Sequence, residues 1–430
     1  MNKDKFNLLK NVKFSVISFV INIFLVFATY RLVIVYEGIE AVGIWSLLMA
    51  WATLIRVGDI GMGGAIVRFI SSKNIEIDMA EIRKFIDTGL VMNFIAFMFL
   101  TLFGYFLLSI NLHNVVPDKY LLQSQSLLPI LFIGIFLSTM SSIIIASLQG
   151  IHLGYIGAYL SVSGNIVQIF FVFLLVPNVG LLGLAWAQLI QFSLLSVFGW
   201  GLITHKLNVG TILPTGFSFV ILRQMFTFSI KAQVANIANG MFEPISKILF
   251  NQFGTLQEQG FYELAYKTVS LTRNTVVSGI FASLPTLTNL INNNPNEAQV
   301  FYVKAQKKVT IAISIIILCV IIFSPLVSWI WMGQFEINYW LFVLFISIGF
   351  WINTFGATAY NLGLATGIMK SNIIASFIML LVLIISAYLL GNFYQSMGVS
   401  IATGISLACG GILIKVLNEK LIFKNEGKNL

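Results

Sequence analysis

The sequence predicts an all-α polytopic membrane protein, with about twelve transmembrane helices in two six-helix lobes around a central cleft. Of its 430 residues, 58% are hydrophobic and only 10% are charged, whereas about a quarter of a soluble chain is charged. The mean hydropathy is +0.92, and apolar segments of about twenty residues recur along the whole length. Because such helices satisfy their own backbone hydrogen bonds in lipid, we expect every span to be α-helical.

The predicted spans follow one another with short connections. In order, they are 14–36, 41–67, 84–111, 121–147, 153–176, 181–203, 224–250, 259–288, 309–332, 339–364, 372–391 and 396–417. The second and eighth are long, and we expect both to be interrupted. The residues that predict these interruptions are Gly58, Gly61, Gly63 and Gly64 in the second span, and Gly279 and Pro285 in the eighth.

The basic residues outside the spans predict the orientation. With the N-terminus in the cytoplasm, the cytoplasmic segments hold Lys3, Lys5, Lys10, Lys13, Arg68, Lys73, Arg83, Lys84, Lys206, Arg223, Lys304, Lys307, Lys308, Lys370, Lys415, Lys420, Lys424 and Lys428. The outside loops hold only Lys119. This positive-inside bias predicts an even number of spans with both termini in the cytoplasm. We expect the first helix to be its own insertion signal, since a full-length span follows the Lys-rich start.

The chain is predicted to consist of two similar halves, 1–210 and 211–430, joined by a cytoplasmic connector at 204–223. Arg31, Gly38, the run Gly43-Ile44-Trp45 and Arg56 recur in the second half, with one insertion, as Lys247, Gly254, the run Gly260-Phe261-Tyr262 and Arg273. Six spans per half give the halves the same orientation, as parallel repeats require. Substrate sites in such transporters lie between the halves near the bilayer midplane.

Ionisable residues in the interiors of the spans are confined to the first, second, seventh and eighth, apart from span ends such as Asp87 and Arg223. They are the cations Arg31, Arg56, Lys231, Lys247, Lys267 and Arg273 and the acids Asp59, Glu243 and Glu263. A charge that faces lipid costs at least a few kcal/mol, so these side chains are expected to line a wet cavity. The six cations exceed the three acids and favour an anionic substrate. We therefore predict that the six cations bind the substrate.

A second interpretation of these charges stays open. Arg56 and Asp59, Glu243 and Lys247, and Glu263 and Lys267 are spaced three or four residues apart, so each pair is placed to neutralise itself on one helix face. Arg31 and Lys247 lie close enough to the outer interface to reach water by snorkelling. Lys231 and Arg273 have no acidic neighbour within one turn.

The seventh span contains a candidate hinge at Gly240 and Pro244, because the proline removes the hydrogen bond that the carbonyl of Gly240 accepts. A static kink is the alternative. Polar residues that are candidates for a sugar-binding cavity are Asn22, Asn165, Gln168, Gln188, Gln191, Asn236 and Asn239. Such side chains also commonly bond between helices.

The sequence lacks the motifs that indicate a metal site, a nucleotide motor, an enzyme or a nucleic-acid-binding protein. Cys319 and Cys409 lie within spans and are expected to be buried apolar side chains, and the three histidines are scattered. We therefore expect no metal site and no cofactor. The chain has no phosphate-binding Gly-rich loop and no pattern of nucleophile and base, which excludes a nucleotide motor and gives no enzyme candidate. A nucleic-acid partner is not expected, since the net charge of +9 comes from the cytoplasmic loops and the spans.

The stretch from Arg56 to Arg68, RVGDIGMGGAIVR, is similar to the Asp-Leu-Gly-Leu-Gly-like run that ends in a basic residue after the second helix of one transporter family. With its length, its twelve spans and its six-plus-six repeat, the whole chain resembles the Wzx-type lipid-linked oligosaccharide flippases. These form the polysaccharide-exporter branch of the MATE-like multidrug/oligosaccharidyl-lipid/polysaccharide superfamily.

The resemblance implies that the protein moves an undecaprenyl-pyrophosphate-linked oligosaccharide from the inner to the outer leaflet of a bacterial inner membrane, by alternating access. That unit feeds O-antigen or capsule assembly, with a polysaccharide polymerase and chain-length proteins as possible partners besides membrane lipid. The alternative is an ion-coupled multidrug exporter of the MATE type, which uses acidic cavity residues. A non-transporting scaffold in a polysaccharide assembly complex is a third hypothesis for the function.

Net outward movement needs an energy source, because the chain carries no nucleotide site. Asp59, Glu243 and Glu263 are candidates for binding a coupling H⁺ or Na⁺. Neutralising an acid would free its neighbouring lysine for the phosphates of the substrate. The simpler interpretation is that each acid only neutralises its own lysine.

Overall fold

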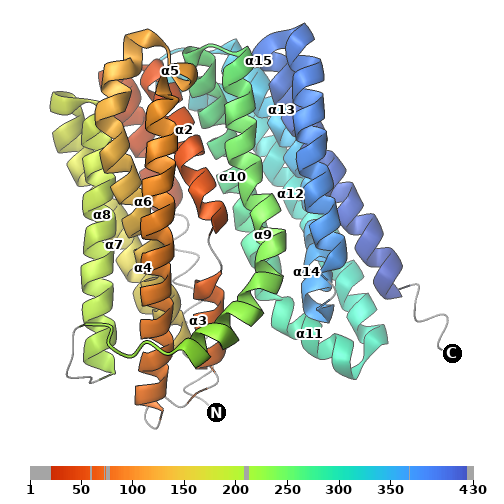
Figure 1. Cartoon of the computed structure of the whole chain (residues 1–430). Helices are drawn as coiled ribbons and strands as arrows, with labels where there is room; N and C mark the ends of the chain where they lie inside the picture. Colours follow the sequence, from red (N-terminus) through yellow and green to blue (C-terminus); the bar gives the residue numbers. More distant parts are fainter. Residues whose placement is uncertain are drawn as a thin grey trace. The chain divides into compact units, whose positions relative to one another are not determined.

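In the computed structural model, the described residues are 21–58, 61–71, 73, 78–207, 213–367 and 369–423 (Figure 1). All regular elements among them are helices, which confirms the predicted all-α class. By their contacts the described residues divide into two compact units. The first takes those within Met1–Gly38 and Trp51–Gln233, and the second takes Ile39–Ala50 and those within Val234–Leu430. The predicted lobes 1–210 and 211–430 stay a prediction.

The helices of the first unit form a bundle in which α4 packs on α6, and α6 and α7 pack on α8. Residues 21–37 are helical. The elements that follow are the last residues of α2 (Ile39–Thr53), η1 (Leu54–Gly58), α3 (Met62–Ser71), α4 (Met79–Ile110), α5 (Leu112–Val115), η2 (Asp118–Tyr120), α6 (Leu121–Gly150), α7 (Gly154–Val179), α8 (Leu181–Lys206) and the start of α9 (Phe219–Phe253). The buried core of this unit lies between α3, α4, α6 and α8.

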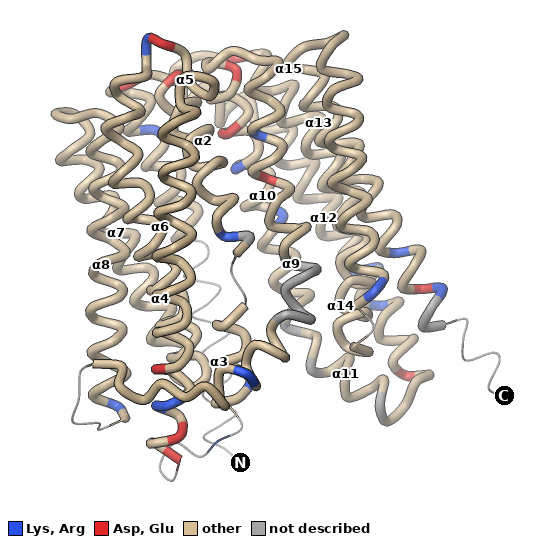
Figure 2. The backbone as a smooth tube through the Cα atoms, in the orientation of Figure 1, with Lys and Arg blue, Asp and Glu red and all other residues tan. Residues whose placement is uncertain are grey.

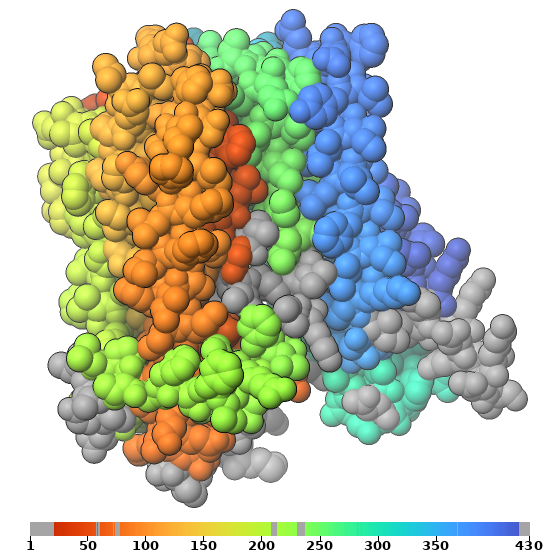
Figure 3. All heavy atoms as spheres, in the orientation of Figure 1, coloured from red at the N-terminus to blue at the C-terminus, as the bar shows by residue number. Residues whose placement is uncertain are grey.

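One face of the first unit is apolar and exposed. Side chains of α4 at 94–110 that are more than one-third exposed are Phe94, Ile95, Met98, Phe99, Leu102, Phe103, Tyr105, Phe106, Leu107 and Ile110. Figure 3 shows α4 and α6, in orange, filling the face of this unit that is turned to the viewer. A soluble protein rarely exposes so long an apolar strip. The strip is what a membrane-spanning helix presents to lipid tails.

The connector before α9 is held against α4. Arg83 and Asp87 form a buried ion pair with 2.6 Å between Nε and Oδ1. The other end of Arg83 donates to the carbonyl of Leu213 at 3.1 Å, and Asp87 accepts from the backbone N–H of Gly216 at 2.9 Å. Because the side chains bind backbone groups of the connector, the residues that lead into α9 belong structurally to the first unit.

In the second unit α13 packs on α10, α12 and α15, and α14 packs on α11 and α15. Its elements are the main part of α2, the end of α9, then α10 (Leu256–Ala282), α11 (Leu284–Asn293), α12 (Pro295–Met332), α13 (Ile337–Thr354), α14 (Ala357–Thr366) and α15 (Lys370–Phe423). Thr255 and Glu258 form a capping box that starts α10. In α15, Gln395 has φ 54°, which breaks the helix between the predicted eleventh and twelfth spans.

Eight helical segments among the described residues are long and apolar enough to cross a membrane. One of them, Lys370–Lys420, contains two predicted spans. The helix α10, which carries Glu263, Lys267 and Arg273, falls outside this set, and of α9 only the shorter apolar segment Phe219–Ser229 is found. Figure 2 shows charged positions along α9 and α10, whereas α6 and α7 contain none and α8 has only Lys206 at its end.

Both predicted interruptions are present. The second span is α2 followed by the 3₁₀ turn η1, and α3 begins only after Gly61, whose φ of +72° favours glycine. The eighth span is α10 and α11, separated at Ser283. The seventh, by contrast, is one continuous helix from Phe219 to Phe253 that includes Pro244.

Candidate functional site

Two lysines and two glutamates of α9 and α10 form a continuous chain of ion pairs in the second unit. Lys247 Nζ lies 2.6 Å from Glu243 Oε1 and 2.6 Å from Glu263 Oε2. Lys267 Nζ contacts the same oxygen of Glu243 at 2.8 Å. Lys247 and Glu263 are 5% and 2% exposed, so each relies on these partners in place of water. The chain of pairs carries no net charge.

Residue Ser46 of α2 extends this chain. Its hydroxyl donates to Glu263 Oε2 at 2.6 Å, and Gln259 Nε2 donates to the Ser46 hydroxyl at 3.5 Å. Ser46 and Gln259 are both fully buried. The polar cluster therefore joins α2, α9 and α10. The helix α2 contributes Ser46, an uncharged residue that was not predicted from the sequence.

The same stretch of α2 lies unusually close to α10. A Cβ added at Gly43 would lie 2.1 Å from the carbonyl oxygen of Leu256, and one added at Gly260 would lie 2.4 Å from that of Ile39. Neither backbone atom can move aside as a flexible side chain would, so both positions require glycine. These two glycines are the ones that the sequence repeat aligns, and each packs against the first residue of the other helix.

The contacts support the pairing interpretation for the two lysines. The predicted pair Glu243–Lys247 forms within α9. Lys267, predicted to pair with Glu263 along α10, contacts Glu243 of α9. Glutamates thus neutralise lysines of the neighbouring helix as well as a lysine of their own helix. Of the ionisable residues predicted within the spans of the second unit, one cation is left without a described carboxylate partner.

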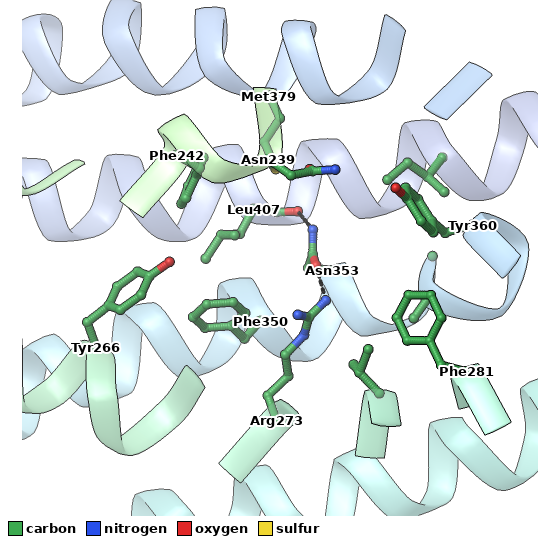
Figure 4. A pocket seen from close by; sticks show the side chains of 14 residues that line it. Asn239, Phe242, Tyr266, Arg273, Phe281, Phe350, Asn353, Tyr360, Met379 and Leu407 are labelled. Atoms are coloured by element: carbon green, nitrogen blue, oxygen red, sulfur yellow. Dashed lines mark hydrogen bonds between the residues drawn. The ribbon is translucent and has the colours of Figure 1, made fainter. Parts of the chain in front are cut away.

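That residue is Arg273 in α10, which projects into a cavity of about 270 Å³ within the second unit (Figure 4). Its guanidinium donates to Asn353 Oδ1 at 2.9 Å and to Thr354 Oγ1 at 3.4 Å, and lies 5.5 Å from the centre of the Phe350 ring. Asn353 in turn donates to the carbonyl of Leu407 at 2.9 Å. Among the described residues, no carboxylate pairs with Arg273. A cation is therefore held in place by neutral groups.

Aromatic and amide side chains form the rest of this cavity. Figure 4 shows Tyr266 at one end, Phe281 and Tyr360 at the other, and Asn239 and Asn353 between them. Asn239 accepts from Ser376 Oγ at 3.0 Å and is hydrogen-bonded to the Tyr360 hydroxyl. Tyr266 is 5% exposed, and within the described part of the chain its hydroxyl has no hydrogen-bond partner.

Sequence reasoning missed Tyr266, although a signal was present. Tyr266 precedes Arg273 by seven residues, which places both on the same face of a helix. Of the amides that were candidates for a sugar cavity, Asn239 lines this one. Asn22, Asn165 and Gln191 instead hydrogen-bond to one another in the first unit, as residues that join helices do.

The remaining predicted residues lie apart from this cavity. Arg56, in η1 of the first unit, is exposed and donates to Ser138 Oγ, and Arg31 is half-buried. Asp59 lies outside the described residues, and so does the side chain of Lys231. Of the hinge candidates, Pro244 is buried and Gly240 is exposed, with open space where a Cβ would be. The described residues hold no group of ligands suited to a metal ion.

The fold and its apolar helices define a multi-pass membrane protein. An inward-facing multidrug-resistance MATE transporter of the MOP superfamily is 14% identical, with 94% of this chain and 95% of that chain covered and a TM-score of 0.81. The lipid II flippase MurJ in an inward closed conformation is 16% identical, with 95% and 87% covered and a TM-score of 0.72. At these identities the likeness concerns the fold.

A MOP superfamily transporter from Pyrococcus furiosus, described as having a binding pocket of reverse polarity, is 14% identical, with 97% and 95% covered and a TM-score of 0.69. No curated protein matches the sequence. The family model described as "Polysaccharide biosynthesis protein" matches residues 8–291. The chain therefore belongs to the polysaccharide biosynthesis protein family, as its resemblance to the flippases of that superfamily predicted.

Proposed function

We propose that the protein is a flippase that moves an undecaprenyl-pyrophosphate-linked oligosaccharide, an O-antigen or capsule repeat unit, from the inner to the outer leaflet of a bacterial inner membrane. The observation that carries this proposal is Arg273. It is a fixed guanidinium that no described carboxylate neutralises, and it lines a cavity among the helices of the second unit.

The chemistry of such a substrate fits this cavity. A pyrophosphate is anionic and cannot cross hydrocarbon unaided, so a carrier must replace its water with fixed cations and hydrogen-bond donors. A guanidinium offers several N–H groups in one plane and matches phosphate oxygens in pairs. The lipid tail has no need of a polar path and can remain in the bilayer.

The six predicted cations have different roles in the proposed function. Lys247 and Lys267 are engaged by glutamates, so they hold α9 and α10 together in this state and would reach substrate only after those ion pairs open. Arg31 and Arg56 are proposed to act for the first unit, together with Lys231 of α9. Alternating access, with Gly240 and Pro244 as the bending point of α9, is part of the proposal.

The relatives support this function over the alternatives. The family is one of polysaccharide biosynthesis, and MurJ is a lipid II flippase of the same fold. A MATE-type exporter of cationic drugs needs acidic groups free to bind a cation. Here Glu243 and Glu263 both bind lysine. Cytoplasmic termini and association with a polysaccharide polymerase and chain-length proteins belong to the proposed setting.

Transport in reconstituted vesicles tests the proposal. Full-length protein is inserted into vesicles that contain a fluorescent undecaprenyl-pyrophosphate-linked oligosaccharide, and the fraction reached by an external glycosidase is followed in time. We expect wild type to expose the inner-leaflet pool and Arg273→Gln to fail. Arg223→Gln, an exposed arginine near the start of α9, is the matched control. Equal flipping by both variants and wild type would refute the proposed role.

A further inference from the structure

We infer that the cavity around Arg273 is a subsite for one sugar phosphate, namely the sugar and phosphate nearest the lipid. Arg273 and the Tyr266 hydroxyl hold the phosphate, and Asn239 and Tyr360 hold the sugar. This inference rests on the proposed function and specifies which part of the substrate this cavity receives.

The Tyr266 hydroxyl supplies the first argument. Tyr266 is 5% exposed and lines the cavity, and its hydroxyl makes no hydrogen bond to a described residue, so the hydroxyl is left open to a ligand in the cavity. The Tyr266 ring is fixed by an edge contact with Phe350, with 5.6 Å between ring centres. Its O–H therefore points in a set direction as an unused donor beside the cavity. A phosphate oxygen is the acceptor that the nearby guanidinium would also attract.

The arrangement along α10 supplies the second argument. Tyr266 and Arg273 are seven residues apart on one helix face, which corresponds to a rise of about 10 Å. This rise separates the two backbone positions, whereas both side chains extend into the same cavity, so a phosphate placed there lies between the two donors. Figure 4 shows the Phe281 and Tyr360 rings beyond Arg273, on the side away from Tyr266.

These two rings supply the third argument. Phe281 and Tyr360 pack edge to face with 6.4 Å between their centres, and Phe281 is 43% exposed, so its face is available to a ligand. A sugar ring offers apolar C–H groups to such a face and hydroxyls to amides and phenols. Tyr360 provides a phenol at this end of the cavity, and Asn239, which is hydrogen-bonded to the Tyr360 hydroxyl, provides an amide beside it.

The size of the cavity limits the ligand. Small-molecule sites usually enclose about 300–1,000 Å³, and this one encloses about 270 Å³. It has room for one sugar with its phosphate and not for a repeat unit of several sugars. Recognition by this cavity is therefore confined to the sugar at the phosphate, and the distal sugars lie outside it.

Binding of soluble fragments to purified full-length protein in detergent tests the subsite. The probes are N-acetylglucosamine 1-phosphate, N-acetylglucosamine and inorganic phosphate, followed by calorimetry and ligand-observed NMR. We expect the sugar phosphate to bind more tightly than either part. Tyr266→Phe should weaken it about tenfold, the size of one hydrogen bond to a charged group. Asn239→Leu should weaken the sugar phosphate but not inorganic phosphate. Tyr394→Phe, an exposed tyrosine outside the cavity, is the control.

Several results would overturn the subsite. They are no binding of the sugar phosphate by wild type, equal binding of the sugar phosphate and inorganic phosphate, or equal effects of Tyr266→Phe and Tyr394→Phe. Elution volume and thermal unfolding confirm that each variant is folded. Vesicle transport separates the two proposals. If Arg273→Gln stops transport while the fragments show no subsite, the flippase function stands and the subsite fails. If the subsite variants alter fragment binding while Arg273→Gln flips normally, the reverse holds.

Discussion

Ser46 and Glu263 hydrogen-bond to each other at 2.6 Å, and they occupy equivalent positions in the two halves of the sequence repeat. Ser46 follows Gly43-Ile44-Trp45, and Glu263 follows Gly260-Phe261-Tyr262. The glycines of the two runs make the reciprocal close approach of α2 to α10. Residues that the repeat aligns therefore contact each other at this point, while the division of the chain into two similar halves stays a prediction.

We predict that Gly260→Val opens the contact between α2 and α10. The added carbons meet the backbone oxygen of Ile39, so the helices must separate, at a cost of about 1–3 kcal/mol, as for other overpacked sites. Thermal unfolding of the purified protein measures the loss. Gly134→Val, in α6, is the control, because a Cβ at Gly134 meets nothing within 4 Å. An equal loss in both variants would mean that the close approach does not matter.

We predict that Glu263→Gln destabilises the second unit by about 3–5 kcal/mol, the usual cost of removing one partner of a buried ion pair. Lys247 keeps Glu243 but loses its second carboxylate. The double variant Glu263→Gln with Lys247→Met should recover part of this loss, since no uncompensated charge remains. A double-mutant cycle on unfolding free energies measures the coupling, and additive effects would contradict it.

We predict that Arg56→Ala and Arg273→Ala each strongly reduce glycan export in cells while the protein still inserts. Lysine at either position should give intermediate export, since it keeps the charge and loses the planar donor group. Surface polysaccharide measures export, and immunoblotting of membranes measures insertion. Wild-type export by the double Gln variant would rule out a pyrophosphate site at these arginines.

We predict that Pro244→Ala traps one access state. Alanine restores the backbone N–H that proline lacks, so α9 gains a hydrogen bond and resists bending. Cysteine-accessibility labelling on either side of residue 244 reports the state. Gly240→Ala tests the neighbouring position, where the structure leaves room for the methyl group. Normal export with unchanged labelling in both variants would leave Pro244 a purely structural residue.

We predict that Glu243→Gln and Glu263→Gln leave the response of transport to imposed pH and Na⁺ gradients unchanged, although the overall rate falls with stability. Each acid is bound by lysine and is therefore not available for a coupling ion. Vesicles with imposed gradients measure the response. Loss of the gradient effect in either variant, with flipping retained, would identify that acid as the coupling site.

The sequence was sufficient for the all-α class and for the two interruptions, because apolar length and glycine conformation act locally. Gly61 and the break at Ser283 lie where the predicted interruptions do. It was insufficient for partners, which depend on how helices face each other. Lys267 meets Glu243 on another helix, although Glu263 is one turn away. Tyr266 was missed because one tyrosine in an apolar span looks the same whether it faces a core or a cavity.

The division of the two units has a consequence for a chain cut at the connector. A fragment ending at 210 carries Ile39–Ala50, which packs with the second unit, and a fragment starting at 211 carries the described residues up to Gln233, which pack with the first. Each fragment would thus contribute one segment to the unit that the other fragment mainly forms. Co-expressed fragments should reassemble by exchanging these segments, whereas either fragment alone would lack the segment that the other supplies. Complementation between halves would in this chain depend on α2 and α9, the two helices that contribute residues to both units.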